Sequence, residues 1–327
     1  MNRRQLIHYA GVAGMALLQN CSLPSTATQG PPRRRIARLL GTQPTPQSDA
    51  QGAAFRQAML DLGYVEGQNL IIEERFVIGD PQLVVPAMEV ASIPVEVILV
   101  VSFSAARAVQ SVTTTIPIVS AGQGDLVAEG VVDSLGNPGG NVTGLSTPSL
   151  VSKQLQILQE CMPALTRVAV FVDTTNPVVP GEVYEAPARA LGLRLQFIGA
   201  GKPEEVESAF EAAAQQRAEA IFVLQGPGIG FNQTRIAELA VQHRLPSMWG
   251  QSDAIARGGL LGYGANRIDL HRRAAGYVDK ILKGARPADL PIELPSQFDF
   301  PINLKTAQAL GLTIPQSVLS QATELIQ

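Results

Sequence analysis

The sequence predicts an α/β protein with two doubly wound units, each containing a parallel β-sheet covered by helices. Short β-branched segments alternate with segments of helical periodicity through most of the chain, which is the pattern of parallel sheets with helical connections. The length of 327 residues suits two units that each bury a core of their own. Hydrophobic residues make up 46% of the chain and charged residues 16%, which is typical of a folded globular protein and excludes a disordered one.

Residues 1–29 have the features of an export signal. A pair of arginines precedes the apolar stretch 11–18, which is well below the ~20 residues that a membrane-spanning helix needs. The arginine pair also resembles a twin-arginine signal, so the general secretory route and the twin-arginine route both remain open. Residues 18–21 resemble a lipobox, in which Cys21 would be lipidated, and cleavage near Ala27 is the alternative.

The rest of the chain is expected outside the cytoplasm, in the periplasm or an equivalent extracytoplasmic space. Its only attachment to a membrane would be a lipid on Cys21, because no later apolar run is long enough to span a bilayer. The formal net charge of −3 and the aromatic fraction of 5% provide no basic or stacking surface for nucleic acid. The arginine run 33–35 is interpreted as a solvated edge before the first strand.

The first unit begins directly after that run. Its strands are short and rich in β-branched residues, and its helices place apolar residues three and four positions apart. The first helix, for example, aligns Phe55, Met59 and Leu62 and ends at Gly63. We expect, in order, a strand over 36–40, this helix over 49–62, strands over 70–76 and 95–101, a helix over 105–113, a strand over 116–120, a helix over 126–135 and a strand over 140–146.

The same alternation then starts again and forms the second unit. Helices over 269–283 and 305–310 both end on a glycine, and prolines between them indicate an extended segment. We expect helices over 151–161, 182–191, 204–216, 233–243, 269–283 and 305–310, and strands over 167–172, 193–198, 220–224, 246–249 and 259–263. Two such units place the carboxyl ends of their strands and the N-termini of their helices around a cleft, where ligands bind in folds of this class.

Catalytic and metal-binding chemistry has little support in the sequence. With two cysteines and three histidines, the chain lacks the residues for a thiolate or histidine metal site. Cys161 ends an apolar helix face and is expected in the core, while His243 and His271 fall beside arginines and are expected at the surface. Residues 226–230 have the spacing Gly-x-Gly-x-Gly instead of a complete dinucleotide fingerprint, which favours a tight turn. We therefore expect no enzyme activity, no cofactor and no metal.

Binding chemistry is better represented at the strand ends of the first unit. One buried strand runs directly into a helix whose free N–H groups and positive dipole end suit a carboxylate. The next strand is followed by a glycine-rich turn that adds a carboxylate of its own, which could hold an ammonium group. The residues expected to bind here are Ser102, Phe103, Ser104, Gly122, Gly124 and Asp125.

Matching strand ends of the second unit carry polar side chains as well. Thr174 and Asn176 follow the strand over 167–172, and Gln225 follows the strand over 220–224. Trp249 is the single tryptophan and ends a strand just before a polar loop that contains Asp253. A tryptophan at such a place suits a wall on which a ligand ring stacks, although a core position is about as common.

Eight segments spread over nearly the whole mature chain carry a family resemblance. They are 63–70 (GYVEGQNL), 115–119 (TIPIV), 137–144 (NPGGNVTG), 257–260 (RGGL), 281–284 (ILKG), 287–291 (PADLP), 302–307 (INLKTA) and 310–315 (LGLTIP). In this order they closely resemble the ABC-transporter substrate-binding proteins of the tryptophan/tyrosine type, which have a type I periplasmic-binding-protein fold. Many of these segments are turns and hinges, so they say little about the ligand.

The resemblance implies two α/β lobes joined by three crossovers, which close over a ligand and present it to a permease in the inner membrane. Carried over to this chain, the first lobe comprises residues 34–146 with 256–292, and the second comprises residues 147–255 with 293–327.

Four positions of the family pattern bear on the site. Gln43 falls on the first cleft loop, and Asp125 matches the acidic position after the fourth strand. Leu126 stands where a proline is common, so that loop departs from the pattern. Trp249 falls where relatives often carry a different aromatic residue.

The expected function is that of an exported, monomeric binding protein of an ABC importer. Its ligand would be a small carboxylate-bearing molecule, such as an apolar or aromatic amino acid. Helix N-termini at Ser104 and Gly124 would hold the carboxylate, and Asp125 or Asp253 the amine, while aromatic residues would contact the side chain. Two alternatives remain: a ligand-sensing protein of the same fold that acts on a signalling receptor, and an enzyme that uses cleft carboxylates.

Overall fold

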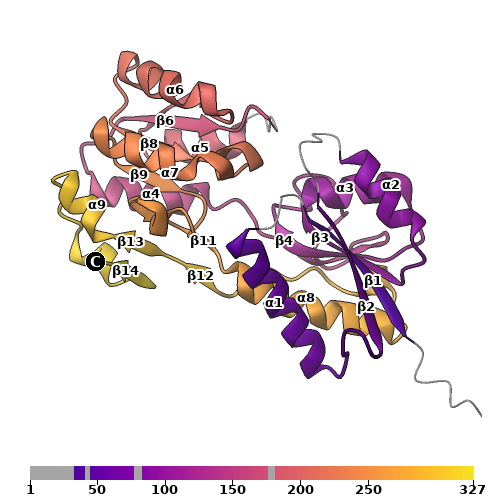
Figure 1. Ribbon diagram of the computed structural model, residues 1–327. Coiled ribbons are helices and arrows are strands. Elements are labelled where there is room, and N and C mark those ends of the chain that lie inside the picture. Colours follow the sequence, from indigo (N-terminus) through magenta and orange to yellow (C-terminus); the bar gives the residue numbers. More distant parts are fainter. Residues whose placement is uncertain (1–32, 41–44, 77–82, 176–180) are drawn as a thin grey trace, which may run out of the picture. The chain divides into compact units, whose positions relative to one another are not determined.

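A computed structural model describes residues 33–40, 45–76, 83–175 and 181–327 (Figure 1). The expected export signal, Cys21, Gln43 and Asn176 lie outside these residues. None of the helices within them is both long and apolar enough to cross a bilayer.

The first sheet has five parallel strands in the order β2-β1-β3-β4-β5. They are β1 (Arg34–Leu40), β2 (Leu70–Phe76), β3 (Val97–Ser102), β4 (Ile118–Gln123) and β5 (Val142–Leu145). Alternate residues of a strand enter different cores: Ile36 packs with Phe55 on one face of the sheet, and Ala37 packs with Val109 on the other.

Four helices cover this sheet. They are α1 (Pro46–Asp61), α2 (Val84–Ser92), α3 (Phe103–Val112) and α8 (Arg267–Leu282). Helices α1 and α8 lie side by side on one face, although they are far apart in the sequence (Figure 1). Helices α2 and α3 contact each other and share the other face with Leu126 and Ile292.

The second sheet has seven strands in the order β14-β13-β10-β9-β8-β6-β7. They are β6 (Arg167–Val172), β7 (Arg194–Gly199), β8 (Ala220–Val223), β9 (Ser247–Trp249), β10 (Leu261–Gly262), β13 (Pro301–Asn303) and β14 (Glu324–Ile326). All neighbours run parallel except β10 and β13. Around it lie α4 (Val151–Cys161), α5 (Glu182–Ala190), α6 (Pro203–Gln215), α7 (Pro227–Gln242), α9 (Leu304–Ala309), α10 (Gln316–Leu319) and the short 3-10 helix η1 (Ile255–Arg257).

The chain passes between the two sheets three times: from β5 to α4, from β10 to α8, and after α8 and the 3-10 helix η2 (Pro287–Asp289) back to β13. The last two passages pair with each other, because β11 (Gly264–Ala265) and β12 (Phe298–Asp299) form an antiparallel ribbon. Two largely parallel sheets with helical connections and three crossovers confirm the predicted fold class.

Some helices differ from the expected ones. Residues 126–135 form turns in place of the expected helix, because the amide of Val131 returns to the carbonyl of Leu126 and Gly130 has a φ of +66°. Helix α7 begins at Pro227 rather than at residue 233, since glycines conceal its first turn while proline suits position N1. Helix α2 was not expected, because its nearly uniform apolar residues show no periodicity.

One strand lies on the other side of a predicted lobe boundary. Strand β10 belongs to the second sheet, where Leu261 pairs with Met248, whereas residues 256–292 were grouped with the first lobe. The strand pairing therefore moves this boundary into the ribbon that begins at β11. The other lobe limits stay a prediction.

Candidate functional site

The junction of β3 and α3 forms the first part of the candidate site. Strand β3 ends at Ser102 and α3 starts at the next residue. The Ser102 hydroxyl accepts a hydrogen bond from the Ala105 amide at 3.2 Å and lies 3.0 Å from the Ser104 hydroxyl. All three residues from 102 to 104 are half-buried, so two hydroxyls and the first amides of α3 are grouped at the carboxyl edge of the sheet.

The turn after β4 packs against this junction. Gly122 and Gly124 have φ angles of +90° and +100°, which side-chain-bearing residues rarely adopt. A Cβ at Gly124 would lie 2.5 Å from the Phe103 ring, so glycine is needed for the ring to lie against the turn. A Cβ at Gly122 would lie 3.1 Å from Leu270 in the first turn of α8. The structure thus brings the expected glycines together with Phe103 and with α8.

The Asp125 carboxylate stabilises the turn in which this residue lies. Its Oδ1 accepts hydrogen bonds from the amides of Val127 at 3.1 Å and Ala128 at 3.0 Å. The carboxylate is therefore engaged with backbone, which is the common arrangement of an aspartate in a turn. This reduces its suitability as the group that receives an ammonium ion.

Asp173 plays a corresponding structural part in the second sheet. The side chain is 5% exposed. One carboxylate oxygen accepts from the amide and hydroxyl of Thr175 at 2.8 and 2.6 Å, and the other accepts from the Gly228 amide at 2.7 Å. A Cβ at Gly226 would lie 2.2 Å from this carboxylate. The glycines of 226–230 thus begin a helix capped by Asp173, which fits the expected tight turn.

Thr174 and Gln225 occupy strand ends and are exposed. The Thr174 hydroxyl donates to the carboxylate of Glu205 on α6. The side-chain amide of Gln225 donates to the carbonyl of Gly250, which links the ends of β8 and β9. Both side chains are at the predicted edge of the sheet, and each already has a protein partner.

Trp249 lies in the core instead of forming a wall for a ligand ring. The side chain is 1% exposed, and its Nε1 donates to the Ser247 hydroxyl at 2.9 Å. The indole packs in the cluster that also contains Phe171 and Ile236, and a Cβ at Gly259 would lie 2.6 Å from its nitrogen. Because side chains two positions apart share a strand face, Ser247 was the sequence feature that could have indicated a buried, satisfied indole.

The loop after β9 meets the start of α8. Asp299 of β12 accepts from the Asn266 side-chain amide at 2.8 Å and from the Ser252 hydroxyl at 3.4 Å. Arg267 and Asp253 are both half-buried nearby. Burial lowers the pKa of Arg267, whereas the charges of Asp253 and Asp299 act to raise it. Arg267 and Asp299 were not among the binding residues expected from the sequence, although an arginine directly after the helix-capping Asn266 was an indication of such a role.

His271 was expected at the surface but is 1% exposed. Its Nδ1 lies 2.8 Å from the carbonyl of Arg267, which requires the proton on Nδ1. Burial and the charges of Arg38 and Arg267 lower the pKa of His271 to about 4, so the ring is neutral. Arg38 is likewise 1% exposed and forms an ion pair with Glu74. The surface expectation failed because α8 buries this face on the first sheet.

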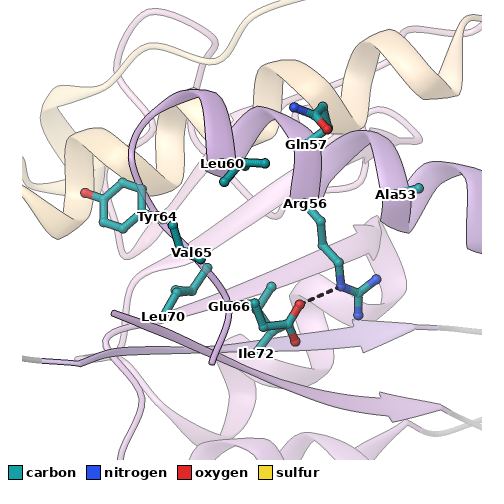
Figure 2. A pocket seen from close by; sticks show the side chains of 9 residues that line it. All are labelled: Ala53, Arg56, Gln57, Leu60, Tyr64, Val65, Glu66, Leu70 and Ile72. Atoms are coloured by element: carbon teal, nitrogen blue, oxygen red, sulfur yellow. Dashed lines mark hydrogen bonds and ion pairs between the residues drawn. The ribbon is translucent and has the colours of Figure 1, made fainter. Parts of the chain in front are cut away.

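A pocket of about 370 Å³ lies between α1 and β2, and none of the predicted binding residues lines it (Figure 2). Arg56 pairs across it with Glu66 at 3.0 Å. The other lining side chains are largely apolar and are Ala53, Gln57, Leu60, Tyr64, Val65, Leu70 and Ile72. Among the described residues, no group of three histidine, cysteine or acidic side chains is placed to hold a metal ion.

Known proteins share this fold over most of the chain. A family model described as "ABC transporter substrate binding protein" matches residues 44–326. A tyrosine-binding protein of Clostridioides difficile (strain R20291) is 23% identical over 93% of this chain and 90% of its own length.

Solved structures give the same result. A conserved domain protein from Vibrio cholerae aligns with a TM-score of 0.82 and 28% identity, covering 89% of this chain and 99% of that one. An ABC domain in complex with L-Trp from Streptococcus pneumonia aligns with a TM-score of 0.81 and 24% identity, covering 90% of this chain and 100% of that one. The fold is thus that of the type I periplasmic binding proteins.

Proposed function

The chain belongs to the family of ABC transporter substrate-binding proteins, and from this premise we propose that it captures a small carboxylate-bearing ligand, such as an apolar or aromatic amino acid. The grouping at the carboxyl edge of the first sheet is the observation that carries the proposal. There the hydroxyls of Ser102 and Ser104 and the first amides of α3 stand beside the Phe103 ring. This set offers donors for a carboxylate and an apolar surface for a side chain.

The ammonium group of such a ligand is assigned to Asp253. Asp125 is engaged with the amides of its own turn, and Asp173 caps α7. Asp253 has no such bonds to the described residues and is half-buried in the loop after β9. The names of two relatives agree with an aromatic amino acid as ligand, since one is a tyrosine-binding protein and the other was solved with L-Trp.

Delivery completes the proposed function. The chain is exported by way of residues 1–29, acts as a monomer outside the cytoplasm, and gives its ligand to an ABC permease in the inner membrane. A lipid on Cys21 would tether it to the membrane. Affinity arises as the two lobes enclose the ligand, because a ligand that contacts both lobes favours the closed state.

A ligand screen tests the ligand class. The chain without residues 1–29 is melted in the presence of each common amino acid and of related organic acids. L-tyrosine or L-tryptophan is expected to raise the melting temperature, since a ligand that binds only the folded state stabilises it. Absence of any response to amino acids and organic acids would show that the ligand class is wrong.

Substitutions of two serines of α3 form a test and a matched control for the proposed carboxylate site. Ser104→Ala removes a hydroxyl at the N-terminal end and is expected to weaken amino-acid binding about tenfold, the usual worth of a hydrogen bond to a charged group. Ser111→Ala removes a hydroxyl in the last turn, where it donates to the Ala108 carbonyl at 2.7 Å, and should leave affinity unchanged. Equal affinities of the two variants in titration calorimetry would rule out the α3 site.

A further inference from the structure

Arg267 is a half-buried cation that has no close anionic partner among the described residues. It is the first residue of α8 and is half-buried. The neighbouring arginines 272 and 273 both pair with Asp269, at 3.6 and 3.7 Å. The guanidinium of Arg267 forms no hydrogen bond and no ion pair within 4.0 Å to the described residues, although Asp253 and Asp299 contribute to its electrostatic environment. A partly desolvated guanidinium without a close partner is costly, so an anion that covers it is stabilised.

The first turn of α8 adjoins the candidate site on two sides. Leu270 packs against Gly122 of β4, the strand that leads into the turn beside Phe103. Asn266, directly before Arg267, binds Asp299, and Asp299 in turn accepts from Ser252 next to Asp253. Arg267 is therefore held between the carboxyl edge of the first sheet and the loop that contains Asp253.

We propose that Arg267 recognises the carboxylate of the ligand, together with the neutral donors of α3, and thereby makes the site selective for amino acids over the corresponding amines. A guanidinium binds a carboxylate through two parallel N–H···O bonds, which neutral hydroxyls and amides do not provide. With Asp253 facing the ammonium group, the site carries opposite charges that match a zwitterion. This inference rests on the proposed function and adds the group that selects the ligand class.

A thermodynamic cycle tests whether Arg267 binds the carboxylate, because it removes the guanidinium from the protein and the carboxylate from the ligand. Binding of L-tyrosine and tyramine, and of L-tryptophan and tryptamine, is measured by calorimetry on the chain without residues 1–29 and on Arg267→Gln. Each amine keeps the ring and the ammonium group and lacks only the carboxylate. The wild type is expected to prefer the amino acid by more than about 100-fold, because the usual worth of a charge-assisted bidentate pair is added to that of the α3 donors. In Arg267→Gln the amino acid should weaken about 100-fold while the amine changes less than about threefold.

Two further variants separate recognition from structure. Arg272→Gln removes an exposed guanidinium from the second turn of α8 and should keep the wild-type preference. Arg267→Lys keeps the charge without the planar guanidinium and should retain part of the preference for the amino acid. It serves as the test variant if Arg267→Gln does not fold.

The outcomes distinguish this inference from the proposed function. A preference that is unchanged in Arg267→Gln, or an equal loss for amino acid and amine, would overturn the role of Arg267 and leave the proposed ligand class intact. A wild type that binds neither amino acid would instead reject the ligand class and the present inference with it.

Discussion

Asp125, Asp173 and Asp253 each follow a strand, and their hydrogen-bond partners among the described residues give each a different role. Asp125 accepts from two amides of its own turn. Asp173 is buried and caps a helix that begins far along the sequence. Asp253 has no such bonds to the described residues. Aspartates that follow a strand were therefore correctly expected at the edge of a sheet. Whether their carboxylates are free for a ligand depends on hydrogen-bond partners such as Gly228, which the local sequence does not reveal.

Trp249 is predicted to contribute to stability and not to ligand binding. Trp249→Phe removes the bond to Ser247 and leaves unfilled volume in the core, which should cost about 1–3 kcal/mol in the free energy of unfolding. Affinity for L-tyrosine or L-tryptophan should stay within about threefold of the wild type. Denaturant unfolding and calorimetry measure the two effects. Loss of affinity at unchanged stability would restore the stacking role.

His271 should make the protein less stable in acid. Its pKa is about 4 in the folded state against an ordinary 6.5, so the unfolded chain takes up a proton first as the pH falls. The contribution of the neutral ring is fully present above pH 6.5 and is lost as the pH falls toward 4, by about 3 kcal/mol in all.

Denaturant unfolding between pH 7 and 4 measures this contribution. His271→Asn keeps a donor for the Arg267 carbonyl without titrating, so its stability should fall less steeply than that of the wild type. His243→Asn changes an exposed histidine and serves as the control. Parallel stability curves for the wild type and His271→Asn would contradict the prediction.

At the scale of elements, the start of α7 shows where the local sequence was sufficient and where it was not. Strong periodicity located α4 and α6 within a few residues, because each buries one apolar face on a neighbouring sheet. The beginning of α7 depends on Asp173, which lies on a different part of the chain. The turns at 126–135 likewise depend on the left-handed conformation of Gly130, which overrides an apolar pattern typical of a helix.

Gly226 is predicted to be essential for the start of helix α7. Its φ of 179° is open to any residue, but a Cβ would lie 2.2 Å from the Asp173 carboxylate. Gly226→Ala should therefore break the cap and destabilise the fold by about 2–3 kcal/mol. Gly230→Ala, in the same helix, meets nothing within 4 Å and should be neutral or stabilise by up to about 1 kcal/mol. Similar melting temperatures for the two variants would refute this account.

At the scale of the whole molecule, the return of α8 to the first sheet determines the site. The family resemblance carried by eight segments implied two lobes and three crossovers. It did not predict which charged residues the crossovers bring together. Asp299 lies more than 30 residues after Ser252 and Asn266 in sequence, and the β11–β12 ribbon that contains it brings it to both.

Attachment of the whole chain to a membrane is the last property that can be tested separately from binding. If the lipobox is used, Cys21→Ala prevents lipidation and should move the protein from the membrane fraction to the released periplasmic fraction. Cys161→Ala is the matched control, since Cys161 is a buried residue at the end of α4 and should leave the distribution unchanged. Mass spectrometry of the mature N-terminus identifies the cleavage point in each case. A wild-type protein that is already soluble and starts near residue 28 would exclude the anchor while leaving export intact.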